Sequence, residues 1–319
     1  MHVSRRGFLT IAAGGGAMLA ASPAIGASRQ PVRFVAMGCL PYGAENLPKF
    51  DRLLAAAEKA DPAFLVHLGD IKSGSSRCED AIYADIRRRF DQVGVPVVYT
   101  PGDNEWTDCH RQGMDPYERL AHLRRVFFDT PQRSLGRRPF DVVSQAQADP
   151  AFAAYVENVR FVRERIVFAT LHVVGSNNNL SEAPAAAAEH AARTAANLAW
   201  LEAAIAEARR IDAPGLVLFW QADVFEEAAK YNRTGFAETL DHLATLARVF
   251  AKPVLVVHAD GHRFHWRRLV DAEGRDVPYL QFLQVMGAGD IHAVEVTVDP
   301  ERPGLFSVAP LIVPENGPY

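Results

Sequence analysis

Short apolar runs alternate with longer segments of helical periodicity along most of the chain, and this pattern constrains the fold more than any other feature. Runs of strand length cover residues 32–37, 63–68, 95–100, 166–174, 216–220 and 254–258. Between them, apolar residues recur at helical spacing after Asn46, a candidate N-cap, and Ala-rich helical stretches cover 186–210 and 235–250. Strands separated by helices predict an α/β fold with a mostly parallel, buried sheet.

Two regions depart from this alternation. Residues 111–165 form a long, polar and only partly helical segment, which we predict to be a cap or insertion. Near the C-terminus, Val294, Val296 and Val298 alternate with polar residues, and a second apolar run covers 305–308 after a turn. This alternation predicts an antiparallel hairpin in a second sheet. The absence of internal repeats and long linkers indicates one domain over residues 28–319.

The first 27 residues have the pattern of a twin-arginine export signal. Arg5 and Arg6 precede Phe8 and Leu9, and an apolar stretch rich in Gly and Ala follows, with small residues near its end. The stretch is short for a membrane span, so no stable membrane span is expected. We therefore predict export by the twin-arginine machinery to the periplasm or the outside; an uncleaved anchor and a disordered tail are the alternatives.

Charge and cysteine content exclude some classes of function. The net charge is -4 and basic runs are not interleaved with aromatic residues, which argues against a nucleic-acid partner. The chain has Cys39, Cys78 and Cys109 but no CxxC pair, which argues against a structural zinc site. Cys78 and Cys109 follow the second and third predicted strands, which we expect to be neighbours. An oxidising compartment would therefore pair these two and leave Cys39 free.

Polar side chains follow several predicted strands, where ligands bind in open α/β sheets. Asp70, Asp103 and Asp260 each follow one, and His262 comes two residues after Asp260. A single aspartate after a strand is more often a cap or turn former, but several at one sheet edge repel one another unless a cation neutralises them. Carboxylate, amide and imidazole ligands suit Mg, Mn, Fe or Zn, so we predict one or two divalent metal ions.

The order of these motifs resembles the calcineurin-like metallophosphoesterases, which include the purple acid phosphatases. Gly69-Asp70 resembles the second family motif, whose aspartate bridges two metals. In Gly102-Asp103-Asn104-Glu105, Asp103 replaces a ligand Asn and Asn104 replaces a His. In Ala259-Asp260-Gly261-His262, Asp260 replaces a His and His262 matches one. Gln221 stands where the family has a ligand His.

A bacterial secreted branch of that family is similar in more detail, through its Gly-Asp-Asn-Glu-Trp third motif and a Gly-Asp-x-Pro-Tyr first motif. Here Cys39 replaces the first-motif aspartate, and Pro41 stands where the wider family has a His. The resemblance implies an α/β/β/α sandwich. It also implies one metal position on Asp70, Asp103, Asp260 and Gln221, and another on Cys39, Asp70 and His262. Cys39 is equally well interpreted as a small buried residue.

The function implied by the resemblance is metal-dependent hydrolysis of a small phosphorylated molecule. Asn104 cannot act as the general acid that a His in its place could be, so Glu105 or His110 would have to substitute. Asn177, Asn178 and Arg111 are candidates for phosphate contact, although an Asn cluster is also typical of a turn. The rival hypothesis is an inactive, exported binding protein on the same fold, favoured by Cys39, Pro41, Asn104 and Gln221. The lack of a GxSxG motif argues against a serine hydrolase.

Overall fold

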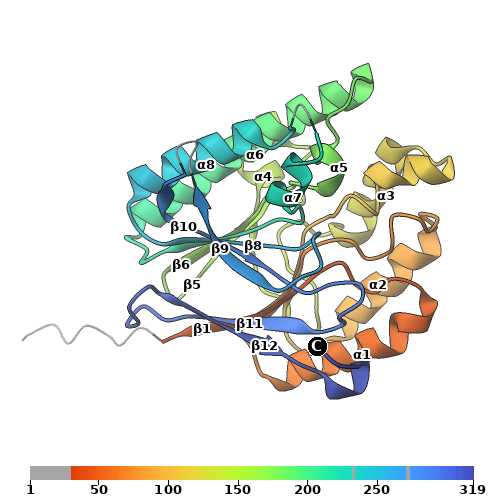
Figure 1. Ribbon diagram of the computed structural model, residues 1–319, viewed down its shortest axis with the longest axis horizontal. Coiled ribbons are helices and arrows are strands. Elements are labelled where there is room, and N and C mark those ends of the chain that lie inside the picture. The colour runs from red at the N-terminus through yellow and green to blue at the C-terminus, as the bar shows by residue number, and fades with distance from the viewer. Residues whose placement is uncertain (1–29, 232–233, 271–273) are drawn as a thin grey trace, which may run out of the picture.

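The computed structural model describes residues 30–231, 234–270 and 274–319, so the predicted export signal at 1–27 lies outside the described residues. Two β-sheets are stacked between helices (Figure 1). Figure 1 shows α6 and α8 on one outer side of the stack and α1 and α2 on the other. No helix of the described segments is both long and apolar enough to cross a membrane.

The first sheet, as far as the chain is described, has five strands in the order β12-β11-β1-β2-β3. They are β1 (Val32–Met37), β2 (Phe64–His67), β3 (Val97–Tyr99), β11 (Ala293–Val298) and β12 (Phe306–Leu311). The first three pair in parallel, whereas β11 is antiparallel to β1 and to β12. The parallel part therefore presents the ends of β1, β2 and β3 at one edge.

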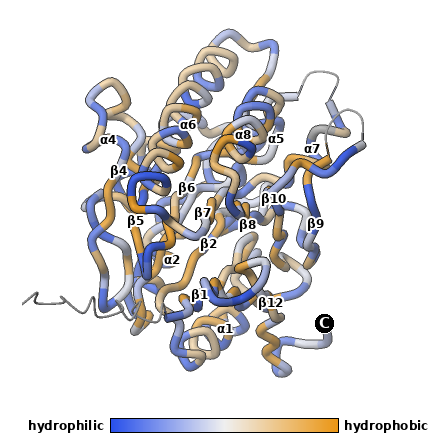
Figure 2. Tube along the Cα trace, turned by 90° about the vertical axis from the view of Figure 1, so that its left-hand side faces the viewer, coloured by the Kyte–Doolittle hydropathy of each residue, from blue (hydrophilic) through white to orange (hydrophobic). Residues whose placement is uncertain are grey.

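The second sheet has seven strands in the order β4-β5-β6-β7-β8-β10-β9 within the described ranges. They are β4 (Val143–Ser144), β5 (Val159–Arg163), β6 (Ile166–Thr170), β7 (Leu216–Phe219), β8 (Val254–His258), β9 (His265–Val270) and β10 (Asp276–Gln284). The middle strands β6, β7, β8 and β10 pair in parallel, and antiparallel pairs flank them. The edge strand β9 is largely hydrophilic in Figure 2.

The helices connect these strands. They are α1 (Leu47–Lys59), α2 (Asp80–Gln92), α3 (Pro116–Phe127), α4 (Gln145–Ala148), α5 (Gly175–Asn178), α6 (Pro184–Arg210), α7 (Val224–Ala228) and α8 (Ala237–Phe250). Short 3₁₀ helices cover Ala44–Asn46, Thr107–Gln112, Pro150–Phe152 and Pro314–Asn316. Asn46 is the N-cap residue of α1, as predicted, but its side chain donates to the Tyr42 carbonyl at 2.7 Å instead of capping the helix.

Three apolar layers hold the stack together, and the middle layer lies between the sheets. There Phe34 stacks on Phe64 with ring centroids 5.1 Å apart, and Phe168 stacks on Phe219 at 6.2 Å. Phe34 also meets Phe219 edge-on at 5.4 Å, so side chains of both sheets interlock. The outer layers pack α1 and α2 on the first sheet and α6 and α8 on the second. Burial of each such ring stabilises the fold by about 1.5–3 kcal/mol.

The position of the C-terminal hairpin corrects the prediction from sequence. The predicted strands at 294–298 and 305–308 form β11 and β12, but β11 pairs with β1 in the first sheet rather than in the second. Alternation identifies a buried face, here Val294, Val296 and Val298, but carries no information on which sheet offers a free edge. The second sheet instead ends in the antiparallel pair β9 and β10, and the polar, exposed positions of the edge strand β9 hid this pair in the sequence.

The segment at 111–165, predicted as a cap or insertion, contributes to both halves of the stack. Helix α3 packs against α2, on the side of the first sheet. Strands β4 and β5 extend the second sheet beyond β6. This segment therefore supplies structural strands as well as loops.

Candidate functional site

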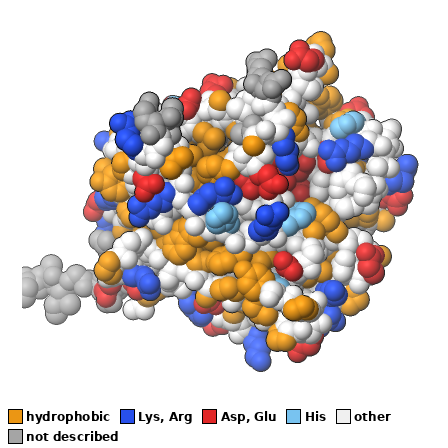
Figure 3. All heavy atoms as spheres, in the orientation of Figure 1, with side chains coloured by type: hydrophobic (Ala, Val, Ile, Leu, Met, Phe, Trp, Pro, Cys, Tyr) orange, Lys and Arg blue, Asp and Glu red, His pale blue; other side chains and the backbone are white. Residues whose placement is uncertain are grey.

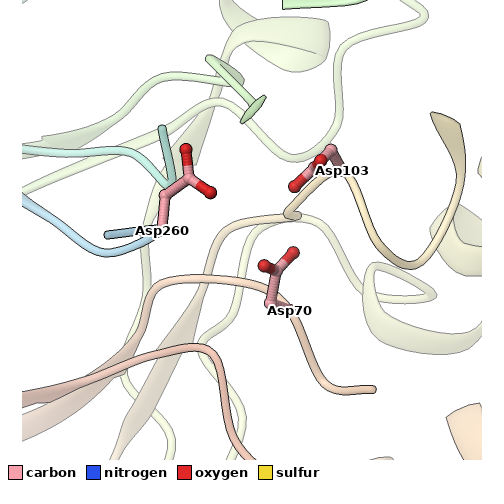
Figure 4. Close-up of side chains that lie close together, drawn as sticks. All are labelled: Asp70, Asp103 and Asp260. Carbon is pink, nitrogen blue, oxygen red and sulfur yellow. The ribbon is translucent and has the colours of Figure 1, made fainter. Parts of the chain in front are cut away.

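Three aspartates from the ends of three strands come together where the two sheets meet. Asp70 follows β2 and Asp103 follows β3 in the first sheet, whereas Asp260 follows β8 in the second. One carboxylate oxygen of each lies within 4.8 Å of the other two. Figure 4 shows the three side chains pointing into a common space. The structure thus brings together three of the residues that the strand-end pattern singled out.

Two glycines permit this close approach. Gly69 has a φ of +73°, and a Cβ at this position would lie 2.3 Å from the backbone nitrogen of Gly102. A Cβ on Gly102 would in turn lie 2.1 Å from Oδ1 of Asp70. Any larger residue at either position would push the loops after β2 and β3 apart, so the Gly-Asp pairs of both motifs are sterically required.

The backbone at the site is held in the left-handed region at several non-glycine residues, four of them in the first, second and last motifs. The φ angles are +54° at Cys39, +58° at Asp70, +69° at Asp260 and +59° at His262. Asp tolerates this conformation better than most residues, and Cys and His less well. Strain of this kind persists only where the surrounding packing enforces it, and it gathers at functional sites.

The aspartate cluster is electrostatically unfavourable without a cation. Burial, followed by the charges of Asp103 and neighbouring carboxylates, raises the pKa of Asp70 well above its ordinary value. Burial and the charge of Asp103 do the same to the pKa of Asp260. Burial also raises the pKa of Asp103. A divalent cation would relieve this repulsion, so the donor set fits a hard metal ion.

Gln221, at the end of β7, turns its amide nitrogen rather than its oxygen toward the aspartates. Its Nε2 donates to Oδ2 of Asp70 at 3.1 Å and to Oδ1 of Asp103 at 2.9 Å. Its Oε1 accepts the backbone N–H of Gly175 at 2.6 Å, and this bond fixes the orientation of the amide. Gln221 could offer an oxygen to a metal only by leaving that N–H unpaired. Its present role is a neutral bridge between two carboxylates.

The Tyr42 hydroxyl occupies the space between Asp70 and His262. It donates to Oδ2 of Asp70 at 3.0 Å, accepts from the Asn104 amide at 2.8 Å and lies 3.4 Å from Nε2 of His262. A second cation between Asp70 and His262 would have to displace this hydroxyl. Sequence reasoning did not single out Tyr42 as a site residue, although it follows Pro41 in the first motif.

Cys39 borders the aspartates as a buried thiol. Its Sγ donates to Oδ2 of Asp70 at 3.4 Å and accepts the backbone N–H of Asp260 at 3.2 Å. Burial, followed by the charges of Asp70 and Asp260, raises the pKa of the thiol well above its ordinary value. Neither this sulfur nor the His262 imidazole belongs to the group of donor atoms within 4.8 Å of one another. The geometry therefore fits one cation better than two.

Comparison with known proteins found similar structures but no relative by sequence. No protein-family model matches the chain, and no curated protein matches it by sequence. Among solved structures, TT1561 of Thermus thermophilus has 10% identity and a TM-score of 0.46, over 88% of this chain and 99% of that protein. Purple acid phosphatase PPD1 from yellow lupin (Lupinus luteus) seeds has 11% identity and a TM-score of 0.52 over 85% of this chain. This chain spans 50% of the lupin chain.

The chain has the same fold as that purple acid phosphatase over the matched residues. The predicted α/β/β/α sandwich is thereby confirmed. At 11% identity the likeness concerns the fold alone, so the chemistry of the site has to be argued from this chain's own residues.

The third motif places its polar residues around the aspartates in different ways. Asn104 lines the crevice, and its backbone N–H donates to Oδ1 of Asp70 at 3.2 Å. Glu105 is fully buried and accepts hydrogen bonds from the Tyr99 hydroxyl at 2.7 Å and the backbone N–H of Asp70 at 3.0 Å. His110 is exposed and bonds to the Thr107 carbonyl at 2.6 Å, outside the residues that line the crevice.

The residues considered for phosphate contact also differ from one another. Asn177 and Asn178 are buried in α5, a turn in which φ is +54° and +53° at these residues. Asn177 accepts the Gly235 N–H at 2.8 Å, and Asn178 donates to the Gly235 carbonyl at 3.1 Å. Both therefore hold a turn. Arg111 is half exposed, lines the crevice and pairs with Asp108 at 2.6 Å.

The fold forms an open crevice of about 440 Å³ above the aspartates. Residues that sequence reasoning missed line it together with the aspartates: Tyr42, Asp108, Ser176, Glu227, Lys230 and Tyr231. The hydroxyl oxygen of Ser176 lies 2.7 Å from Oδ2 of Asp103 and 2.8 Å from Oδ1 of Asp108, and it donates its single proton to one of the two carboxylates. Ser176 was detectable as part of the Ser-Asn-Asn-Asn turn, whereas Lys230 and Tyr231 carry no local signal.

The predicted disulfide is present between Cys78 and Cys109, and Cys39 is the free thiol. The bond joins the loop after β2 to the 3₁₀ helix after β3, so it ties together the two segments that carry Asp70 and Asp103.

Proposed function

We propose that the chain is a metal-dependent phosphoester hydrolase that uses one divalent cation held by Asp70, Asp103 and Asp260. The observation that carries this proposal is the group of three carboxylate oxygens within 4.8 Å at converging strand ends. The metallophosphoesterase fold supports it. Carboxylate oxygens suit hard cations, so Mg and Mn are the cations that we propose for this site.

We propose that the site holds one metal ion rather than two. The Tyr42 hydroxyl already bridges Asp70 and His262, and Cys39 offers a neutral thiol beside them. Gln221 presents nitrogen donors where a ligand oxygen or imidazole would be needed. A Cys39, Asp70 and His262 position would therefore be filled only weakly.

The crevice supports a small phosphorylated substrate. A cation at the aspartates would stabilise negative charge on a phosphoryl group and activate water. Arg111 and Lys230 stand on the crevice wall, where they can hold the phosphoryl oxygens by charge-assisted hydrogen bonds. Each now pairs with an acidic neighbour, Asp108 or Glu227, and would exchange that partner for the substrate.

None of the residues considered as general acid is placed to donate a proton to the leaving group. Asn104 has no proton to give, Glu105 is fixed by hydrogen bonds below the aspartates, and His110 lies away from the crevice. His262 is the imidazole that lines the crevice, and burial lowers its pKa, which favours its neutral form. We therefore expect a preference for esters of acidic alcohols, such as aryl phosphates, which need no general acid.

The second candidate function is a binding protein that does no hydrolysis. The Gln221 bridge favours it, because this amide stabilises the two carboxylates in the absence of any cation. The same crevice would then bind a phosphorylated molecule through its basic rim.

The test is titration of Mn and Mg into chelator-treated protein by calorimetry, together with hydrolysis of an aryl phosphate. We expect one saturable site, and Asp103→Asn should weaken it at least about tenfold. Asp129→Asn makes the same change at an exposed residue that does not line the crevice, and it is the matched control. Absence of saturable binding would contradict the metal site. Binding without turnover would select the binding protein.

We also propose that the chain is exported by the twin-arginine machinery. The Cys78–Cys109 disulfide supports an oxidising destination. Replacing Arg5 and Arg6 by Lys should retain the protein, with its signal uncleaved, inside the cell. Export of that variant at an unchanged rate would disprove the route.

A further inference from the structure

A second cavity adjoins the crevice on the far side of the loop that carries Asp260. It has a volume of about 290 Å³ and lies between α7 and the start of β9. Gly261 lines it, whereas its neighbours Asp260 and His262 line the crevice. Oδ2 of Asp260 accepts the backbone N–H of Asp223 at 3.0 Å, and the Asp223 side chain lines the second cavity. The loop of residues 260–262 is therefore the wall that separates the two cavities.

Basic side chains converge on this second cavity because of the strand period. Arg263, His265 and Arg267 alternate along the chain into β9, so they lie on one face, and all three line the cavity. On the face of the molecule that Figure 3 shows, Lys, Arg and His side chains lie side by side across the middle, and acidic side chains lie directly above them.

Arg267 has N–H groups that make no strong hydrogen bond within the described residues. Its guanidinium lies 4.2 Å from the ring centroid of Phe225, which holds it in place. Its polar contacts are long, at 3.4 Å to Oδ2 of Asp223 and 3.3 Å to Oε1 of Gln284. Its Nε is buried without a partner in the described part of the chain. A guanidinium has five N–H groups and forms its strong bonds at shorter distances, so Arg267 is suited to accept an anion.

The acidic residues of the cavity do not cancel its basic character. Oδ1 of Asp223 already accepts the backbone N–H groups of Phe225 and Glu226, at 3.0 and 3.1 Å. Its Oδ2 faces Arg267. Glu226 is exposed and its side chain is solvated. Arg263 is exposed as well, with no hydrogen bond or ion pair within the described residues, and remains available.

We infer that this cavity binds a second anionic group, a phosphate or carboxylate, of the substrate whose phosphoester lies at the aspartates. The coupling of the two cavities rests on the proposed function, whereas anion binding by Arg263 and Arg267 does not. The substrate class is then a phosphomonoester that carries a further anionic group, and the cavity determines specificity by rejecting neutral analogues.

The first test measures anion binding alone. Inorganic phosphate is titrated into chelator-treated protein by calorimetry. Arg263→Gln should weaken binding about tenfold, the loss expected for one charge-assisted bond, and Arg267→Gln at least as much. Arg268→Gln, on the opposite face of β9 and paired with Asp276, is the matched control and should bind as the natural protein does. Arg267→Lys keeps the charge and checks that the site still folds.

The second test measures coupling, through the KM values of hydroquinone bisphosphate and phenyl phosphate, two aryl phosphates, with the Mn-loaded protein. We expect a lower KM for the bisphosphate, and Arg263→Gln should remove most of this difference while leaving kcat for phenyl phosphate unchanged. If Arg263→Gln, Arg267→Gln and the control Arg268→Gln bind phosphate with the same affinity, the anion site is wrong. If neither ester is hydrolysed, the proposed hydrolase fails while the phosphate titration still decides the anion site.

Discussion

Gln221 places an uncharged donor between two buried carboxylates, and this detail shows what single residues conceal in a sequence. Asp70, Asp103 and Asp260 could be predicted because strand ends converge at a sheet edge. The orientation of the Gln221 amide could not, because it depends on the backbone N–H of Gly175 at the start of α5, far from Gln221 in the sequence. The Tyr42 hydroxyl was missed for the same reason, since its partners come from three separate loops.

Cys39→Asp should convert the site into one that depends on metal. Position 39 has a φ of +54°, which Asp tolerates better than Cys, so the backbone favours the change. A fourth carboxylate beside Asp70 and Asp260 should lower the free energy of unfolding of the chelated protein by about 1–3 kcal/mol. Added Mn should then bind at least about tenfold more tightly than in the natural protein, because a hard ligand replaces a thiol. Melting temperatures with chelator and with Mn measure both effects.

Cys39→Asn separates charge from shape in this experiment. It has the size of Asp and also tolerates a positive φ, but adds no charge. We expect little change in metal affinity and no loss of stability in chelator. If Cys39→Asp leaves metal affinity unchanged, position 39 does not face the bound cation.

At the scale of elements, the strands and helices were easier to predict than their partners. The six apolar runs found in the sequence all contain strands, because buried parallel strands need continuous apolar residues. Their division into two sheets could not be derived from periodicity, which fixes a buried face but not a neighbour. Strand β9 escaped because an edge strand with charged residues lacks the apolar run that marks a buried one, and β10 escaped because polar residues interrupt its apolar ones.

The Cys78–Cys109 disulfide gives a prediction at this scale. It closes a chain segment with a sequence separation of 31 residues, so loop-closure entropy predicts a loss of about 3–4 kcal/mol in the free energy of unfolding when both cysteines become Ser. Urea unfolding of the double variant measures this loss. Because the bond joins the loops of Asp70 and Asp103, metal affinity should fall as well.

Cys39→Ser is the control for the loss of a cysteine without the loss of a cross-link. Its effect on unfolding should be smaller than that of the double variant. Equal stability of the natural protein and the double variant would mean that the disulfide contributes nothing to the folded state.

At the scale of the whole molecule, a buried ion pair joins α3, which packs on the side of the first sheet, to the loop before β5 of the second sheet. Arg124 of α3 donates to Glu157 at 2.5 and 3.0 Å, and His172, which follows β6, bonds to the same carboxylate at 2.7 Å. Glu157 and His172 are fully buried. Burial alone would raise the pKa of Glu157, but the charge of Arg124 and the bond to His172 outweigh it and hold that pKa well below its ordinary value of 4.5. Burial lowers the pKa of His172.

These two shifts predict where the fold fails in acid. Both groups bind a proton more readily in the unfolded chain, so their stabilising effect is complete at high pH and is lost as pH falls. The loss begins below about pH 6.5 through His172 and steepens below about pH 4.5 through Glu157, where it adds about 1.4 kcal/mol per pH unit. Urea unfolding of chelated protein between pH 3 and 8 measures how the free energy of unfolding changes with pH.

Glu157→Gln should lower the free energy of unfolding by about 3–5 kcal/mol at neutral pH, because Arg124 loses its partner. It should also flatten the fall in stability at acid pH. Glu164→Gln, in the exposed turn between β5 and β6, should change neither. An acid limb of the same slope in Glu157→Gln would show that other carboxylates set the acid limit.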